Sequence, residues 1–136
     1  MVTETITYTD FKGVERKETH YFNLSETELT KLNLSKSGGL EEYLTRMAEK
    51  LDGPAMAGFY EFLIDASYGV MSEDGRKLVK NKEVLDDFKF SGAYDVFYMT
   101  LLENGATKGI EFFTNVVPEK FRAQMAKNVA EAKTNN

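Results

Sequence analysis

The apolar residues of this 136-residue chain change their spacing once, near Ser25. Before that point, Val2, Ile6 and Tyr8 alternate with threonines, which is the period-two pattern of a strand with one buried face. After Gly39 the apolar residues recur three and four positions apart, as on an amphipathic helix. The change predicts an α+β fold that is mainly α, with an N-terminal β-hairpin packed on a compact body of about five to seven helices.

The predicted hairpin spans residues 2–23 and turns at Asp10 to Gly13. Asp suits the first position of a type I turn, and Gly can adopt the left-handed conformation that closes a bulged hairpin. A hairpin of two strands is marginal in water by itself, so it should lie against the helical body. Ser25 and Glu28 have the spacing of a capping box and predict that a short helix begins there.

The helical body is predicted over residues 25–130 and contains one helix that is apolar nearly all round. This helix follows Pro54 and should be central to the core; its apolar residues are Met56, Phe59, Tyr60, Phe62, Leu63 and Ile64. Gly69 and a turn over 72–75 should end it, before a short extended piece over 76–80. Further helices are expected over about 40–51, from Asn81, from Ser91 to Gly105, over about 110–117 before Pro118, and over about 121–129.

The length of the chain fits a single domain, residues 1–136, of which residues 131–136 form a polar and frayed tail. The formal net charge of −5 argues against attraction to nucleic acid or to an anionic membrane. No stretch reaches the roughly 18 apolar residues of a membrane span, and the N-terminus lacks the pattern of a signal peptide. The chain contains no cysteine, which excludes disulfides and thiolate metal sites. We therefore expect a soluble protein.

The residue types that carry catalytic chemistry do not form a known arrangement. His20 is the only histidine, which excludes a pair of His metal ligands, and the sequence offers no partner residues that would form a Ser-His-Asp catalytic triad with it. The turn at 72–75 lacks the alternating oxygen ligands of a calcium loop. The adjacent acids at 41–42 and at 86–87 point about 100° apart on a helix, and the glycines at 38–39 lack the Lys of a phosphate loop. We expect no enzyme activity, no catalytic residue, no cofactor and no metal site.

The one basic cluster consists of Arg76, Lys77, Lys80 and Lys82, between two apolar segments. A solvated crossover is the first interpretation of this cluster, and a contact for an acidic partner is the alternative.

The helix expected from Ser91 carries two apolar rows, which is more than one core-facing stripe requires. Ala93, Phe97 and Leu101 form the first row, and Tyr94, Tyr98 and Leu102 form the second. One row could therefore cover another chain, with core packing as the alternative for each residue. The residues expected to bind another protein chain are Tyr94, Tyr98, Leu102, Phe112 and Phe113.

The segment from Ser67 to Gly105 has a distinctive order of features. A Ser-Tyr-Gly helix ending is followed by an Asp-Gly-Arg turn at 74–76, by a short Glu-Val-Leu-Asp-Asp-Phe helix, and by Gly-Ala-Tyr-Asp at 92–95. Similar positions upstream are Tyr8, Asp10, Gly13, the run at 21–24 and the run at 38–40. In this order the chain resembles the tail assembly chaperones of long, flexible-tailed bacteriophages, over roughly residues 3–120.

The resemblance implies a non-enzymatic protein that binds and solubilises the helical tape measure protein and assists assembly of the tail tube. It also implies a place in the host cytoplasm during phage assembly and absence from the mature virion. The resemblance admits further partners, namely the tail-tube protein, a longer frameshifted form of the chain, and other copies of the chain in a homo-oligomer. Two alternatives stay open: a structural virion protein of the tail or connector, and a regulatory or host-directed binding protein.

Overall fold

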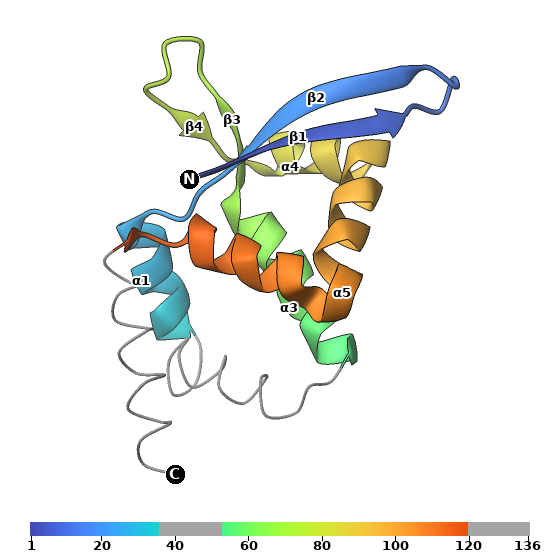
Figure 1. Cartoon of the computed structure of the whole chain (residues 1–136). Coiled ribbons are helices and arrows are strands. Elements are labelled where there is room, and N and C mark those ends of the chain that lie inside the picture. The colour runs from blue at the N-terminus through green and yellow to red at the C-terminus, as the bar shows by residue number, and fades with distance from the viewer. Residues whose placement is uncertain (36–52, 120–136) are drawn as a thin grey trace.

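The computed structural model describes residues 1–35 and 53–119 (Figure 1). Along the chain its elements are β1 (Val2–Thr9), β2 (Glu15–Phe22), α1 (Glu26–Ser35), α3 (Gly53–Ser67), β3 (Tyr68–Met71), β4 (Leu78–Val79), α4 (Lys82–Lys89) and α5 (Gly92–Val116). More of the described chain is helical than extended, so the predicted α+β class, mainly α, is confirmed. The helices expected over about 40–51 and 121–129 and the tail at 131–136 lie outside the described residues.

The predicted N-terminal hairpin is present as β1 and β2, paired in register from Val2 with Phe22 to Thr9 with Glu15. Its turn is built as the sequence indicates: the Asp10 side chain accepts backbone hydrogen bonds from Lys12 and Val14, each 2.9 Å long. Gly13 has a φ of 85°, and its amide donates to the Asp10 carbonyl at 3.0 Å. A side chain at this position would be strained, which explains the glycine.

The expectation of a single hairpin was wrong, because β3 and β4 extend the sheet in the antiparallel order β1-β2-β3-β4. β3 begins directly after α3, and its Tyr68 and Gly69 pair with the end of β2. A Cβ on Gly69 would lie 2.6 Å from Cγ of Leu78, so glycine is needed to leave room for this side chain of β4. β3 is four residues long, which is too short for its sequence to display a strand period. The extended piece expected over 76–80 is confirmed as β4.

The core lies between the inner face of the sheet and the helices α3, α4 and α5 (Figure 1). Phe22 of β2 is fully buried, and its ring contacts the rings of Tyr68, Phe88, Phe97 and Phe112. α3 contributes four buried apolar residues, which confirms the expectation that this helix is central: Phe59, Tyr60, Leu63 and Ile64. Phe22 therefore joins the hairpin to β3, α4 and both ends of α5.

α5 is one continuous helix from Gly92 to Val116, so the predicted end at Gly105 and the separate helix after it were wrong. Figure 1 shows that α5 changes direction along its length. Glycine in a helix costs about 1 kcal/mol relative to alanine. The second half buries Phe112, Phe113 and Val116, and each large apolar side chain that is fully buried contributes about 1.5–3 kcal/mol. Tertiary burial therefore outweighs the local preference of glycine to end the helix. The helix stops before Pro118, as expected.

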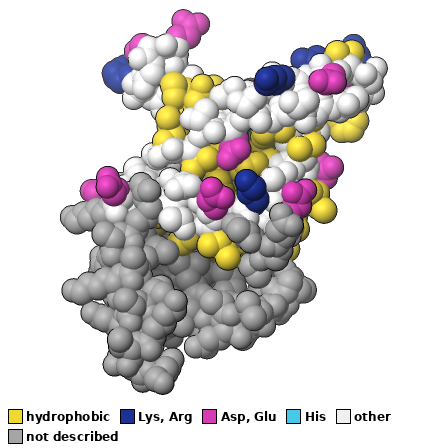
Figure 2. Space-filling model, viewed as in Figure 1, with side chains coloured by type: hydrophobic (Ala, Val, Ile, Leu, Met, Phe, Trp, Pro, Cys, Tyr) yellow, Lys and Arg dark blue, Asp and Glu magenta, His cyan; other side chains and the backbone are white. Residues whose placement is uncertain are grey.

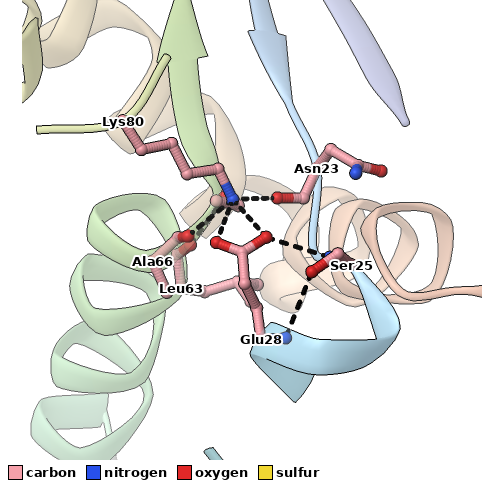
Figure 3. A network of polar contacts seen from close by, with 7 residues as sticks. Asn23, Ser25, Glu28, Leu63, Ala66 and Lys80 are labelled. Carbon is pink, nitrogen blue, oxygen red and sulfur yellow. Dashed lines mark hydrogen bonds and ion pairs between the residues drawn. The ribbon is translucent and has the colours of Figure 1, made fainter. Parts of the chain in front are cut away.

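The predicted capping box is confirmed at the start of α1. The amide of Glu28 donates to Ser25 Oγ at 3.1 Å, and the amide of Ser25 donates to Glu28 Oε1 at 3.0 Å. Figure 3 shows that the Glu28 carboxylate also accepts hydrogen bonds from the Lys80 ammonium group, with Nζ 2.8 Å from Oε1 and 2.7 Å from Oε2. Lys80 donates in addition to the carbonyls of Asn23 and Ala66.

The contacts of Lys80 connect the segment after β4 to the end of β2, to α1 and to α3 (Figure 3). Its side chain is 21% exposed, so Lys80 is not part of a solvated basic crossover. Arg76 and Lys77 are exposed, as that interpretation expects. One partly buried ammonium group thus donates to backbone carbonyls at the ends of two elements, β2 and α3.

Candidate partner-binding surface

The residues predicted to bind a client fall into two groups in the structure. Tyr94, Tyr98 and Leu102 are half-buried on one flank of the first half of α5. Phe112 and Phe113 lie in the second half and are only 4% and 7% exposed, as members of the core. The ring of Phe112 packs against Phe97, and that of Phe113 packs against Phe59 of α3. On the surface of the described chain, the first group alone forms a row.

The two tyrosines of this row are held in place by their neighbours. Their rings are stacked, with centroids 5.8 Å apart and planes 27° apart. The Tyr98 hydroxyl donates to the carbonyl of Ala57 in α3 at 3.0 Å, and Tyr94 packs edge-on against Phe88 of α4. Burial raises the pKa of both phenols, so both stay neutral at physiological pH. The row is therefore an ordered apolar surface.

Charged residues border the row where α5 meets α3. Lys89, at the end of α4, is 3.2 Å from the Glu61 carboxylate and 3.0 Å from that of Asp65. Its ammonium group also lies 5.7 Å from the centroid of the Tyr94 ring. Burial by itself would lower the pKa of Lys89, but the hydrogen bonds that its ammonium group donates to Asp65 and Glu61 outweigh burial and raise that pKa. This border consists of one cation with two acids and is acidic on balance.

A cleft of about 130 Å³ lies between β1 and the two halves of α5. Val2 and Glu4 line it from β1, Phe97 and Leu101 from the first half of α5, and Lys108 and Glu111 from the second half. Figure 2 shows charged side chains of both signs gathered below the hairpin, around a hydrophobic part of the surface. The cleft exists because α5 bends, so the sequence could not predict it.

Glu4 is the unusual residue of this cleft, since it is an acid on the inner side of β1. Burial raises the pKa of its carboxyl group; the positive charge of Lys108 lowers it and the negative charge of Glu111 raises it further. The available signal in the sequence was the position of Glu4 between Val2 and Ile6, which share its side of the strand. The sequence-based interpretation assigned it no role.

His20 packs among aromatic residues and hydrogen-bonding partners. Its ring lies 4.7 Å from that of Phe88, and its two nitrogens are each 3.2 Å from an oxygen, of Tyr68 and of Glu18 respectively. Within residues 1–35 and 53–119, no group of three or more His, Cys, Asp or Glu side chains is arranged to hold a metal ion. In the same ranges, no helix has the length and apolar character needed to cross a bilayer.

Comparison with known proteins identifies one family. Residues 1–136, the whole chain, match the model of a family described as phage tail assembly chaperone. No curated protein and no solved structure matches the chain. The family match confirms the resemblance carried by the order of features from Ser67 to Gly105.

Proposed function

Because the chain belongs to the phage tail assembly chaperones, we propose that it binds the tape measure protein and keeps it soluble while the tail tube assembles. The observation that supports this proposal is the half-buried row of Tyr94, Tyr98 and Leu102 on α5. The row is ordered by contacts with α3 and α4 before any partner arrives. An ordered surface loses little side-chain freedom on binding, which favours affinity.

The geometry of the row suits a helical client. Its residues are spaced four positions apart and therefore follow one another along the flank of α5. A helix laid along this flank would cover the row with its own apolar residues at positions i, i+4 and i+7. The acids Glu61 and Asp65 border the row, so basic residues beside the apolar stripe of the client would be favoured.

In this proposal Phe112 and Phe113 act indirectly, as core residues. They pack against Phe97 and Phe59, which hold α5 and α3 in position behind the row. In this role they would affect client binding only by changing the position of the two helices. A client could reach them directly only if the second half of α5 moved.

The proposed role places the chain in the host cytoplasm during assembly, without catalytic activity and outside the mature virion. Its net charge of −5 would help to keep a complex with an apolar client in solution. Mass spectrometry of purified phage tails tests the last point, since a chaperone should be missing and a structural subunit should be present in stoichiometric amount.

Client binding is tested by co-expressing the chain with the tape measure protein of the same phage. We expect the wild-type chain to keep the client in the supernatant and to co-purify with it. Leu102→Asp should abolish co-purification, because a carboxylate in an apolar contact must lose its water on binding. Met99→Asp is the matched control: Met99 is on the same helix, is 54% exposed and lies outside the row, so binding should persist.

Thermal melts of both variants separate loss of binding from loss of fold. Equal co-purification of folded Leu102→Asp and of Met99→Asp would remove the row from the proposal. Failure of the wild-type chain to retain or solubilise the client would overturn the proposed function as a whole.

A further inference from the structure

The outer edge of β1 has no strand beside it in the described part of the chain, since β1 is the first strand of the sheet. In an antiparallel pair, alternate residues direct their backbone groups toward the partner strand and away from it. Two contacts at the end of β2 show which residues face which way: Tyr21 pairs with Gly69 of β3, and Asn23, directly after β2, donates its amide to the Ser67 carbonyl at 2.9 Å. These odd-numbered residues of β2 therefore face away from β1.

The register of the hairpin then determines which residues of β1 face outward. The cross-strand partners of the odd residues of β2 are themselves odd: Thr3 faces Tyr21, Thr5 faces Thr19, Thr7 faces Lys17 and Thr9 faces Glu15. The backbone groups on the free edge of β1 therefore all belong to threonines, and their side chains are exposed. The bonds within the hairpin belong to the even residues.

The two free edges of the hairpin differ in charge. On β2, beyond the two residues that pair with β3, the residues that face outward include Glu15 and Lys17. On β1 they are uncharged and β-branched. Charged residues, lysine above all, are the usual protection of an edge strand against pairing with another chain. β1 has eight residues, no lysine and no proline, and its one acid, Glu4, is on the inner face, so no outward-facing charge opposes strand addition. At one end of this edge, Gly92 of α5 lies beside the Thr9 carbonyl.

We propose that a second copy of this chain pairs with β1, antiparallel and about a two-fold axis at Ile6. Outward-facing residues must lie opposite one another, which restricts the possible registers. Pairing Glu4 with Glu4 or Glu4 with Asp10 would place like charges in opposition. The register centred on Ile6 avoids both, pairs Thr3 with Thr9 and Thr5 with Thr7, and places Glu4 opposite the tyrosine at position 8.

The ends of β1 support this register. Phe11 at the hairpin turn is 91% exposed and Met1 is 58% exposed. Figure 1 shows that the turn extends beyond α4 and α5, and Figure 2 shows hydrophobic side chains at that end. Pairing centred on Ile6 brings Phe11 of each copy level with Met1 of the other. Both exposed apolar residues would then be covered, once at each end of the interface.

The flank of α5 next to β1 adds apolar surface on the same side. Thr100 lines the cleft together with Val2 and Glu4 of β1. Val96 is one helical turn before Thr100 and is 40% exposed. A second copy joined at the β1 edge would approach this flank, which lies on the opposite side of α5 from Tyr98. The proposed interface and the proposed client surface can therefore be occupied together.

The test is the mass of the purified chain in solution, without any client, measured by sedimentation or by light scattering after gel filtration. The wild-type chain should be a dimer that dissociates on dilution. Thr7→Pro should give a monomer, because proline removes an outward amide and its ring blocks the incoming strand. Lys17→Pro is the matched control, since Lys17 is the cross-strand partner of Thr7 and faces the other edge, so it should stay dimeric.

Cysteine pairing tests the register and replaces the proline variants if they fail to fold. The chain has no cysteine of its own. Under mild oxidation, Thr5→Cys mixed with Thr7→Cys should form a covalent dimer, because directly opposite residues have Cα atoms about 5.5 Å apart. Thr19→Cys mixed with Thr7→Cys should not. A wild-type monomer at all concentrations, a dimer unaffected by folded Thr7→Pro, or covalent pairing through Thr19 would each overturn the proposal.

Discussion

Phe97 and Phe112 are fifteen positions apart in one helix, yet the centroids of their rings lie 5.2 Å apart with an interplanar angle of 82°. At about 1.5 Å per residue, a straight helix would separate them by about 22 Å along its axis. The two rings can meet only because α5 bends between them. Phe22 contacts both rings, at 4.8 and 5.2 Å, so one strand residue holds the two halves of the helix together.

The first prediction concerns this contact. Phe112→Ala should lower the free energy of unfolding by about 3–5 kcal/mol, because it leaves a cavity between the two halves of α5. Ile110→Ala in the same half is the control; Ile110 is 58% exposed, and its loss should change the free energy by less than about 0.5–1 kcal/mol. Equilibrium denaturation measures both. Similar small effects would mean that the second half of α5 is not anchored by its ring contacts.

The second prediction compares two helical glycines. A Cβ on Gly109 would overlap the buried ring of Tyr60, whereas a Cβ on Gly58 would meet nothing within 4 Å. Gly109→Ala should destabilise the chain by about 1–3 kcal/mol because of overpacking. Gly58→Ala should stabilise it by about 0.5–1 kcal/mol, since alanine favours the helix. Thermal melting shows the opposite signs, and a stabilising Gly109→Ala would contradict the packing of α5 on α3.

The third prediction is a pH dependence at Glu28. Burial would raise the pKa of its carboxyl group, but the hydrogen bonds from Lys80 and from the Ser25 amide outweigh burial and lower that pKa below 4.5. A lowered pKa stabilises the folded state above the unfolded pKa, and this stability is lost as the pH falls through the folded pKa. Glu28→Gln should therefore melt earlier than wild type at neutral pH, and the difference should shrink below about pH 4.5.

Glu26→Gln is the control for this effect, because Glu26 is exposed in the same first turn of α1. Its melting temperature should follow that of the wild type at each pH. A difference between Glu28→Gln and wild type that does not change with pH would show that the Lys80 contact makes no pH-dependent contribution.

The fourth prediction concerns Tyr68. Burial, together with the negative charges of Asp87 and Glu18, raises the pKa of its phenol to about 12. A phenol with a raised pKa stabilises the fold below its ordinary value of 10.0 and loses this contribution as the pH rises toward about 12. Spectrophotometric titration should therefore show a late phenol that is missing in Tyr68→Phe. Tyr21→Phe should retain it.

The local patterns were predictable because they depend on neighbours in the chain. The Asp10 to Gly13 turn and the capping box of Ser25 and Glu28 each satisfy backbone groups within a few residues. The side-chain cap of Asn81 on the amide of Val84 is of the same kind. Such interactions are present in any fold that contains the segment, so the sequence is sufficient to identify them.

The candidate surface was predictable in part. The row of Tyr94, Tyr98 and Leu102 follows from helical spacing, and its half-buried position agrees with a second apolar row beside the core. Phe112 and Phe113 could not be placed from the sequence, because an adjacent pair of aromatic residues has the same pattern whether it faces a core or a partner. The bend of α5 turned both toward the core.

By itself, the sequence determined the period of the longer segments, the turns, the caps and the family. The tertiary structure alone decided that α5 continues past Gly105, that β3 and β4 extend the sheet, and that Lys80 is bound by Glu28 rather than by solvent. The physical reason is that each of these features depends on groups far apart in the chain. Glu28 and Lys80 are fifty-two positions apart and share no local signal, and only the burial of the core brings the two charges together.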